Sequence, residues 1–130
     1  MRLQLALNVD DLDGAIDFYS RMFDTRPAKI ETGYANWEIA NPPLKLVLFE
    51  NQAEASGSLN HLGVETETAD EVDDAASRFD TAGLTATEVE ETTCCFAEKT
   101  ETWLTAPDGN RWEWYVKRGD VQPSTGAGCC

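Results

Sequence analysis

The chain contains 130 residues with a mass of 14.4 kDa, and 42% of its residues are hydrophobic. This supply of apolar side chains is enough for one proper core but not for two large ones, so a multidomain protein is excluded. The 24 acidic and 10 basic residues give a net charge of -14 and a pI near 4.2. Such a charge should repel phosphate backbones and anionic membrane surfaces, which disfavours nucleic-acid and membrane partners.

The acidity is interpreted as a solvated surface rather than as a binding site. A carboxylate excess also keeps proteins soluble at high salt, so a high-salt cytoplasm is a hypothesis for the source. The sequence has no stretch near the ~20 apolar residues of a membrane span. It opens into a strand-like run without a basic and then apolar leader. We therefore expect a cytoplasmic protein.

The first half of the chain predicts a strand, a helix and three further strands. Apolar residues alternate from Leu3 to Val9, which is typical of a strand, and Asp10 and Asp11 then offer oxygens that can cap a helix. The predicted elements are a strand over 3–9, a helix over 12–23, extended segments over 28–31, 34–40 and 45–50, and a polar connector over 51–58.

The second half predicts the same order of elements. Thr68 and Glu71 form a capping box in front of an apolar helical pattern, and Gly83 supplies a C-terminal stop. The predicted elements are a strand over 61–66, this helix, extended segments over 85–90 and 112–117, a hairpin-like region over 94–105 between them, and a flexible tail over 119–130.

The two halves align at an offset of 57 residues, which indicates a degenerate internal duplication. The matched pairs are Gln4 with His61, Leu5 with Leu62, Leu7 with Val64, and Met22 with Phe79. We therefore expect an α+β fold in one domain, residues 1–118, with two modules at about 1–51 and 59–118. The strands of both modules should curl into one curved mixed sheet, and its concave side is the expected site.

His61 is the only histidine, which excludes a three-histidine zinc site. It starts the first strand of the second module and is matched by Gln4, while Glu113 lies between Trp112 and Trp114. If both indoles pack on helices, alternation points the Glu113 carboxylate to the concave side, where an unpaired charge is costly. Gln4, His61 and Glu113 then offer an amide oxygen, an imidazole and a carboxylate, a variant of the facial set that binds Fe(II).

A purely structural interpretation of these residues stays open at this point. Glu113 could pair with Arg111 or Lys117, and His61 could be a satisfied histidine at a strand end. Matching the last strand of each module places Val47 opposite Glu113, so the sequence shows no fourth protein ligand.

Cys94 and Cys95 are adjacent, and two thiolates suit a soft ion such as trivalent arsenic or cadmium. Neighbours in a regular strand point to opposite faces, so both sulfurs reach one atom only if the chain bends there. The polar run 90–93 suggests a loop that would permit this. The alternative is that both cysteines are small packing residues. Cys129 and Cys130 form a second pair in the tail, and free thiols are expected throughout.

Several segments together resemble the cadmium-induced protein and organoarsenical carbon–arsenic lyase family of the vicinal oxygen chelate (glyoxalase and bleomycin-resistance) superfamily. The resemblance covers residues 1 to about 118. The segments that carry it are 4–12 (QLALNVDDL), 18–20 (FYS), 33–36 (GYAN), 42–48 (PPLKLVL), 59–65 (LNHLGVE), 92–97 (TTCCFA) and 111–113 (RWE).

The resemblance implies two βαβββ modules and an Fe(II)-dependent dioxygenase that cleaves the carbon–arsenic bond of trivalent organoarsenicals. Gln4, His61 and Glu113 are similar to the family's metal ligands, and Cys94 and Cys95 to its arsenic-binding thiols. Dioxygen would be the co-substrate, a small organoarsenical the partner, and the protein a monomer or homodimer. The rival expectations are a non-catalytic cadmium- or arsenite-binding protein, and a glyoxalase-type enzyme on the same fold.

The sequence departs from the family pattern in the hairpin after the cysteines. A lysine is often found there in the family, whereas this chain has Glu101, with Lys99 two residues earlier. Such a reversed charge could change loop closure or substrate affinity. The terminal cysteine pair resembles a paired-cysteine tail of relatives that could transfer a metalloid, and a mobile tail without a role is the alternative.

Overall fold

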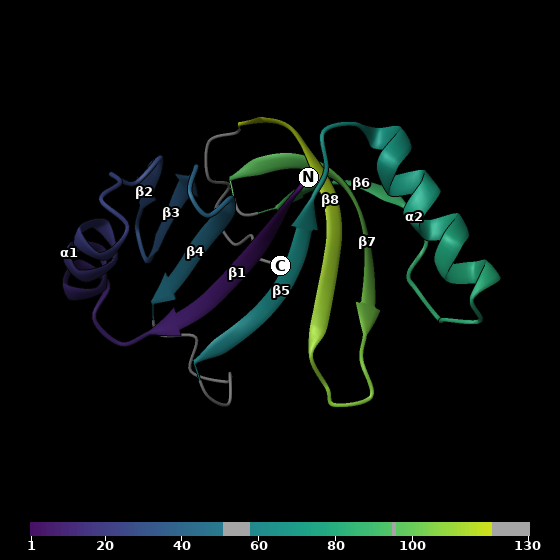
Figure 1. The fold of residues 1–130 in the computed structure, drawn as a ribbon, viewed down its shortest axis with the longest axis horizontal. Coiled ribbons are helices and arrows are strands. Elements are labelled where there is room, and N and C mark those ends of the chain that lie inside the picture. Colours follow the sequence, from purple (N-terminus) through teal and green to yellow (C-terminus); the bar gives the residue numbers. More distant parts are fainter. Residues whose placement is uncertain (51–57, 95, 121–130) are drawn as a thin grey trace. The chain divides into compact units, whose positions relative to one another are not determined.

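A computed structural model of the chain describes residues 1–50, 58–94 and 96–120 (Figure 1). Its elements are β1 (Arg2–Val9), α1 (Leu12–Met22), β2 (Lys29–Glu31), β3 (Tyr34–Ile39), β4 (Leu44–Glu50), β5 (Leu59–Glu65), α2 (Ala69–Thr81), β6 (Glu90–Cys94), β7 (Ala97–Thr105) and β8 (Arg111–Asp120). The order strand, helix and three strands occurs twice, which confirms the predicted α+β fold with two βαβββ modules. Most of the predicted connector, Cys95 and the tail from residue 121 lie outside the described residues.

The chain divides into two compact units. Residues 2–62 form the N-terminal unit, and residues from Gly63 onward, together with Met1, form the C-terminal unit. Strand β5 crosses from the first unit to the second. Each unit contains one helix and has its own buried apolar side chains, as described next.

In the N-terminal unit, α1 and a mixed sheet enclose an apolar core. The strand order is β2-β3-β4-β1, with the start of β5 beside β1, and β1 and β4 are parallel. Alternate side chains of these strands form the core with the first residue of α1: Leu12, Ala35, Trp37, Ile39, Leu46 and Leu48. The intervening positions include Gln4, Asn36 and Lys45, which are buried on the opposite face of the sheet.

In the C-terminal unit, α2 lies against β7 and β8, whose sheet order is β5-β8-β7-β6 (Figure 1). Val72, Ala75 and Phe79 are buried on α2. The rings of Phe79 and Trp114 meet edge to face with centroids 5.3 Å apart. Because Trp114 faces the helix, the neighbouring Glu113 points to the other face of the sheet, as its alternation predicts.

Both helices begin at the predicted caps. Asp11 Oδ1 accepts a hydrogen bond from the Gly14 backbone N–H at 3.1 Å. A Cβ on Gly14 would lie 2.6 Å from Asp11 Oδ2, so any larger residue at this position would require the Asp11 side chain to shift. At α2, Thr68 and Glu71 form the capping box. Gly83 has a φ of 76°, the left-handed conformation that ends a helix and favours glycine.

Two predicted boundaries are wrong. The strand predicted over 85–90 is β6 instead, which begins at Glu90 and extends to Cys94, and the suggested loop over 90–93 is therefore also strand. Strand β8 covers Arg111–Asp120 instead of the predicted 112–117, because it pairs with β7 as far as Ala97. Both segments are polar, and their extended structure comes from cross-strand backbone hydrogen bonds that apolar alternation does not report.

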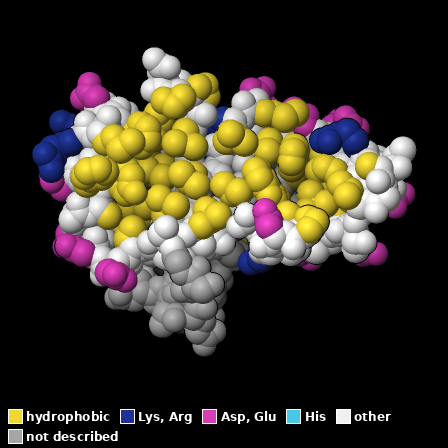
Figure 2. All heavy atoms as spheres, turned by 60° about the horizontal axis from the view of Figure 1, so that its bottom comes forward, with side chains coloured by type: hydrophobic (Ala, Val, Ile, Leu, Met, Phe, Trp, Pro, Cys, Tyr) yellow, Lys and Arg dark blue, Asp and Glu magenta, His cyan; other side chains and the backbone are white. Residues whose placement is uncertain are grey.

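Some large hydrophobic side chains take no part in either core. Leu3, Phe18, Met22 and Ile30 in the N-terminal unit and Leu84 in the C-terminal unit are more than half exposed. Figure 2 shows a face on which hydrophobic side chains (yellow) gather, with acidic side chains (magenta) around its edge. Neither α1 nor α2, the helices of the described residues, has the length and apolar character that crossing a bilayer requires.

Candidate metal centre and substrate site

His61 is buried on β5, and two asparagines orient its ring. Its Nδ1 lies 2.7 Å from Asn60 Oδ1, and Asn60 Nδ2 donates to Asn8 Oδ1 at 2.9 Å. Because the amide nitrogen of Asn60 is engaged with Asn8, the amide oxygen is the acceptor and His61 Nδ1 carries the hydrogen. The lone pair of the neutral ring is then on Nε2, the arrangement in which an oriented histidine binds a metal.

Gln4 lies directly in front of this lone pair. Its side chain is 4% exposed on β1, and its Nε2 donates to His61 Nε2 at 2.8 Å. The same amide carries Oε1, a ligand for hard cations. The ring of Phe49 lies 6.3 Å from that of His61 and contributes an apolar neighbour. The structure therefore brings together two of the predicted ligands, at the positions that the duplication matches.

Glu113 is completely buried in the C-terminal unit, and its charge is compensated. Lys99 Nζ donates to Glu113 Oε2 at 3.0 Å, and this ammonium also lies 4.8 Å from the centroid of the Tyr115 ring. The residues considered as its structural partners are engaged elsewhere: Lys117 pairs with Asp120, and Arg111 stacks on Trp103. The ion pair with Lys99 offsets the cost of burying the Glu113 carboxylate.

Glu101 shares the surroundings of Glu113. Burial, followed by the hydrogen bond and negative charge of Glu113, raises the pKa of the Glu101 carboxyl from 4.5 to about 8, against the lowering effect of Lys99. The neutral carboxyl can donate to Glu113 while Lys99 donates as well. Glu101 thus belongs to a buried cluster with Lys99 and Glu113.

The sequence indicated no site role for Lys99 or Glu101, which stood out only as a departure from the pattern of the family that the chain resembles. Their burial with Glu113 follows from the register of β7 and β8, in which Trp103 is opposite Glu113 and Glu101 is opposite Tyr115. Alternation alone places 99, 101 and 103 on one face of β7. Only the strand pairing shows that this is the face of Glu113.

Cys94 is the last residue of β6, and its backbone pairs with Ala97 of β7. The side chain of Cys94 and all of Cys95 lie outside the described structure. Phe96, the residue after the pair, has a φ of 66°, so the chain is not extended at that residue. The bend that would let both thiols bind one atom concerns residues 94 and 95 themselves and stays a prediction.

A centre made from the predicted residues would combine one imidazole, one amide oxygen and one carboxylate. This donor set fits Fe(II) and leaves coordination positions for other ligands. In the described part of the chain, no three His, Cys, Asp or Glu side chains come together, so the amide of Gln4 is needed for any such centre. Gln4 and His61 belong to one unit and Glu113 to the other, and their joint use stays a prediction.

Comparison with known proteins identifies the family of the chain. The model of the Glyoxalase/Bleomycin resistance protein/Dioxygenase superfamily matches residues 3–114. A trivalent organoarsenical cleaving enzyme of Thermomonospora curvata is 48% identical over 132 residues, which cover 99% of this chain and 87% of that protein. The cadmium-induced protein CadI of Mycobacterium tuberculosis is 53% identical over 121 residues, 93% of this chain and 79% of that protein.

A solved structure supports the fold. The Mn(II)-bound glyoxalase from Novosphingobium aromaticivorans superposes with a TM-score of 0.63 at 15% identity, covering 94% of this chain and 41% of that one. At this identity the likeness concerns the fold alone. The family match spans most of the chain, and two relatives are about half identical to it. This chain therefore belongs to the Glyoxalase/Bleomycin resistance protein/Dioxygenase superfamily, in the family of the trivalent organoarsenical cleaving enzymes and cadmium-induced proteins.

Proposed function

We propose that this protein cleaves the carbon–arsenic bond of trivalent organoarsenicals in an Fe(II)- and dioxygen-dependent reaction. Gln4, His61 and Glu113 bind the metal, and Cys94 and Cys95 bind arsenic. The observation that carries the proposal is the His61 ring, whose Nδ1 is held by Asn60 and whose lone pair faces Gln4. The relative named for organoarsenical cleavage supports the choice of substrate.

Each group has a chemical task in this proposal. Thiolates hold arsenic because soft acceptors prefer sulfur to oxygen. Gln4, His61 and Glu113 would hold Fe(II), which would supply the activation of dioxygen. Asn60 holds His61 so that its Nε2 lone pair faces Gln4, and Lys99 compensates the buried charge of Glu113.

A turnover assay tests the proposal. Protein loaded with Fe(II) under argon is mixed with methylarsenite and then exposed to oxygen, and arsenic species are separated and counted. We expect several equivalents of inorganic arsenite, with none when either iron or oxygen is omitted. Stoichiometric binding without release would contradict the proposal and favour the rival function, a cadmium- or arsenite-binding protein.

Cysteine variants separate the two binding functions. Cys94→Ser or Cys95→Ser should abolish arsenical binding and leave iron occupancy nearly intact, because sulfur binds only the arsenic. Cys129→Ser with Cys130→Ser is the matched control and should bind arsenical as wild type does. Arsenical binding and metal content are measured in parallel. Loss of arsenical binding in the control pair alone would refute the assignment.

Glu113→Gln tests the metal site from the other side. The amide removes the ligand charge, so metal should be retained less well, while arsenical binding to the cysteines persists. Circular dichroism checks that the variant is folded, since the substitution removes the buried ion pair between Glu113 and Lys99. A glyoxalase-type isomerase is disfavoured, because the position expected for a second metal carboxylate is Val47, a buried residue of β4.

A further inference from the structure

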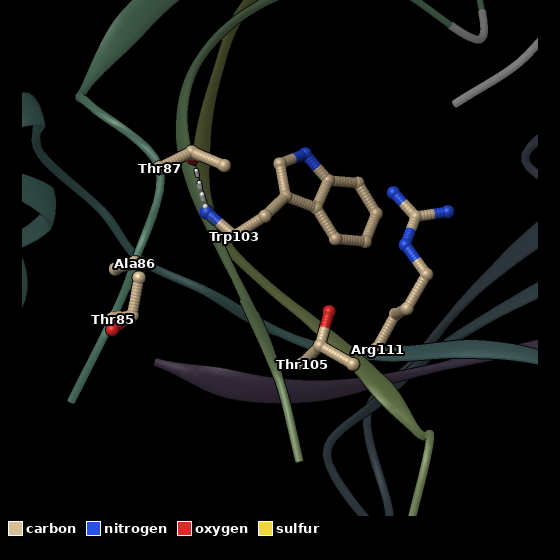
Figure 3. A pocket seen from close by; sticks show the side chains of 6 residues that line it. All are labelled: Thr85, Ala86, Thr87, Trp103, Thr105 and Arg111. Carbon is tan, nitrogen blue, oxygen red and sulfur yellow. Dashed lines mark hydrogen bonds between the residues drawn. The ribbon is translucent and has the colours of Figure 1, made fainter. Parts of the chain in front are cut away.

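The C-terminal unit contains a cavity of about 470 Å³ that the proposed reaction has not used. Six residues line it, and Figure 3 shows them: Thr85, Ala86, Thr87, Trp103, Thr105 and Arg111. The indole of Trp103 and the guanidinium of Arg111 lie together on one side, and the segment 85–87 lies across from them (Figure 3). The lining therefore combines a flat apolar surface, a cation and hydroxyl groups.

Hydrogen bonds hold the segment 85–87 against β7. Thr87 N donates to the Trp103 carbonyl at 2.9 Å, and Trp103 N donates to Thr87 Oγ1 at 2.9 Å. Thr102 Oγ1 also donates to the Thr87 carbonyl at 2.7 Å. Ala86 adds a bridge to Leu104. The walls of the cavity are thus fixed to the sheet before any ligand binds, which lowers the entropy cost of binding.

Arg111 is held by stacking and keeps its charge available. Its guanidinium carbon lies 4.3 Å from the centroid of the Trp103 ring. Although the chain has a net charge of -14, Arg111 makes no ion pair within the described residues. Stacking uses the face of the guanidinium and leaves its N–H edge for hydrogen bonds, the geometry that binds a carboxylate through two parallel bonds.

The cavity adjoins the proposed metal site. In the pairing of β7 with β8, Trp103 is opposite Glu113 and Thr105 is opposite Arg111. Residues opposite each other in an antiparallel pair share a face, with Cβ atoms ~5 Å apart. Trp103 and Glu113 are therefore neighbours on one face. A molecule that contacts the indole lies next to the carboxylate that we assign to the metal.

We propose that this cavity binds the organic group of the arsenical, and that this group is a planar aromatic ring carrying an anionic substituent. The ring packs on the indole of Trp103, the anion accepts from the N–H edge of Arg111, and threonine hydroxyls donate to remaining oxygens. The assignment to an arsenical rests on the proposed function. Recognition of the aromatic anion itself rests only on the Arg111–Trp103 pair and the cavity.

An arsenic-free probe tests the recognition directly. Benzoate is titrated into the full chain without iron and followed by NMR chemical shifts, with cyclohexanecarboxylate as the non-planar comparison. We expect benzoate to bind more tightly, and Arg111→Gln and Trp103→Leu each to weaken it at least ~10-fold. Lys117→Gln, which removes the same charge from β8, should not. Equal affinities for Arg111→Gln and Lys117→Gln, or no binding of benzoate to wild type, would overturn the proposal.

Kinetics then test the assignment to the arsenical. We compare kcat/KM for 4-carboxyphenylarsenite with that for methylarsenite. Arg111→Gln should lower the ratio of the two at least ~10-fold, chiefly through KM of the aromatic substrate, whereas Lys117→Gln should keep the wild-type ratio. An unchanged ratio in Arg111→Gln contradicts the assignment. If neither arsenical is cleaved by wild type, the proposed function fails, and the benzoate titration still decides what the cavity binds.

Discussion

Hydrogen bonds to asparagine side chains orient His61. Asn8, Asn60 and His61 form a chain of hydrogen bonds of 2.9 and 2.7 Å, and this chain determines which ring nitrogen carries the hydrogen. Outer groups of this kind hold metal-binding histidines in one tautomer and one direction. Asn60 is therefore a positioning residue in the proposed centre.

Asn60→Ala should weaken metal binding by ~10–100-fold, because His61 loses the acceptor that holds Nδ1–H. Anaerobic titration with Co(II), followed by absorbance, measures the affinity without turnover. Asn110→Ala, in the turn between β7 and β8, is the control. Equal affinities in both variants would show that Asn60 does not orient the ligand.

Glu101 makes stability depend on pH. Its pKa is raised from 4.5 to about 8, first by burial and then by Glu113. Between these values the folded chain keeps a proton that the unfolded chain releases, so stability falls as pH rises, by at most ~1.4 kcal/mol per pH unit. Urea unfolding between pH 5 and pH 8, a window chosen inside the range of about 4.5 to 8, measures this slope. Glu101→Gln should reduce it, and parallel curves for the two proteins would contradict the raised pKa.

Among the elements, α2 depends on its capping box. Thr68 and Glu71 satisfy N–H groups at the first turn, which otherwise lack partners. Thr68→Ala should lower the free energy of unfolding by ~1 kcal/mol. Thr81→Ala, at the exposed C-terminal end of the same helix, should change it by less than half as much. Denaturant unfolding of both variants checks the difference, and equal losses would mean that the cap contributes little.

Strand β6 marks the limit of prediction at this scale. Local rules predicted α1, α2 and their caps, since apolar spacing and capping oxygens act within a few residues. They placed a strand over 85–90, whereas β6 covers Glu90–Cys94. This polar strand has no apolar alternation and exists because its backbone pairs with β7. The position of β6 matters for the proposed binding of arsenic by the cysteines, because it places Cys94 at the end of a strand.

At the scale of the whole molecule, the net charge of -14 dominates. Like charges repel one another more strongly in the compact state than in the unfolded chain, and salt screens this repulsion over a Debye length of ~10 Å at 0.1 M and ~3 Å at 1 M. Sodium chloride at about 1 M should therefore raise Tm by several degrees. An uncharged osmolyte at equal osmolality is the control. A rise no larger than the control's would contradict the repulsion.

The sequence by itself determined the repeated order of elements, both caps, the match of Gln4 with His61 and the face of Glu113. These features depend on spacing along the chain, on alternation and on an internal repeat, all of which can be read directly from the amino-acid sequence. The sequence also showed the resemblance to the family without the help of a structure. The internal repeat matched Gln4 with His61, and the structure shows that these two side chains are in direct contact.

Only the tertiary structure decided which groups surround Glu113 and where the cavity at Trp103 and Arg111 lies. Lys99 and Glu101 meet Glu113 through the register of β7 and β8, and the cavity at Trp103 and Arg111 also needs the segment 85–87 against the sheet. Register, burial and the pKa values that follow from burial depend on residues distant in the chain. No local pattern contains them, because the free energy that selects a strand pairing is summed over the whole sheet.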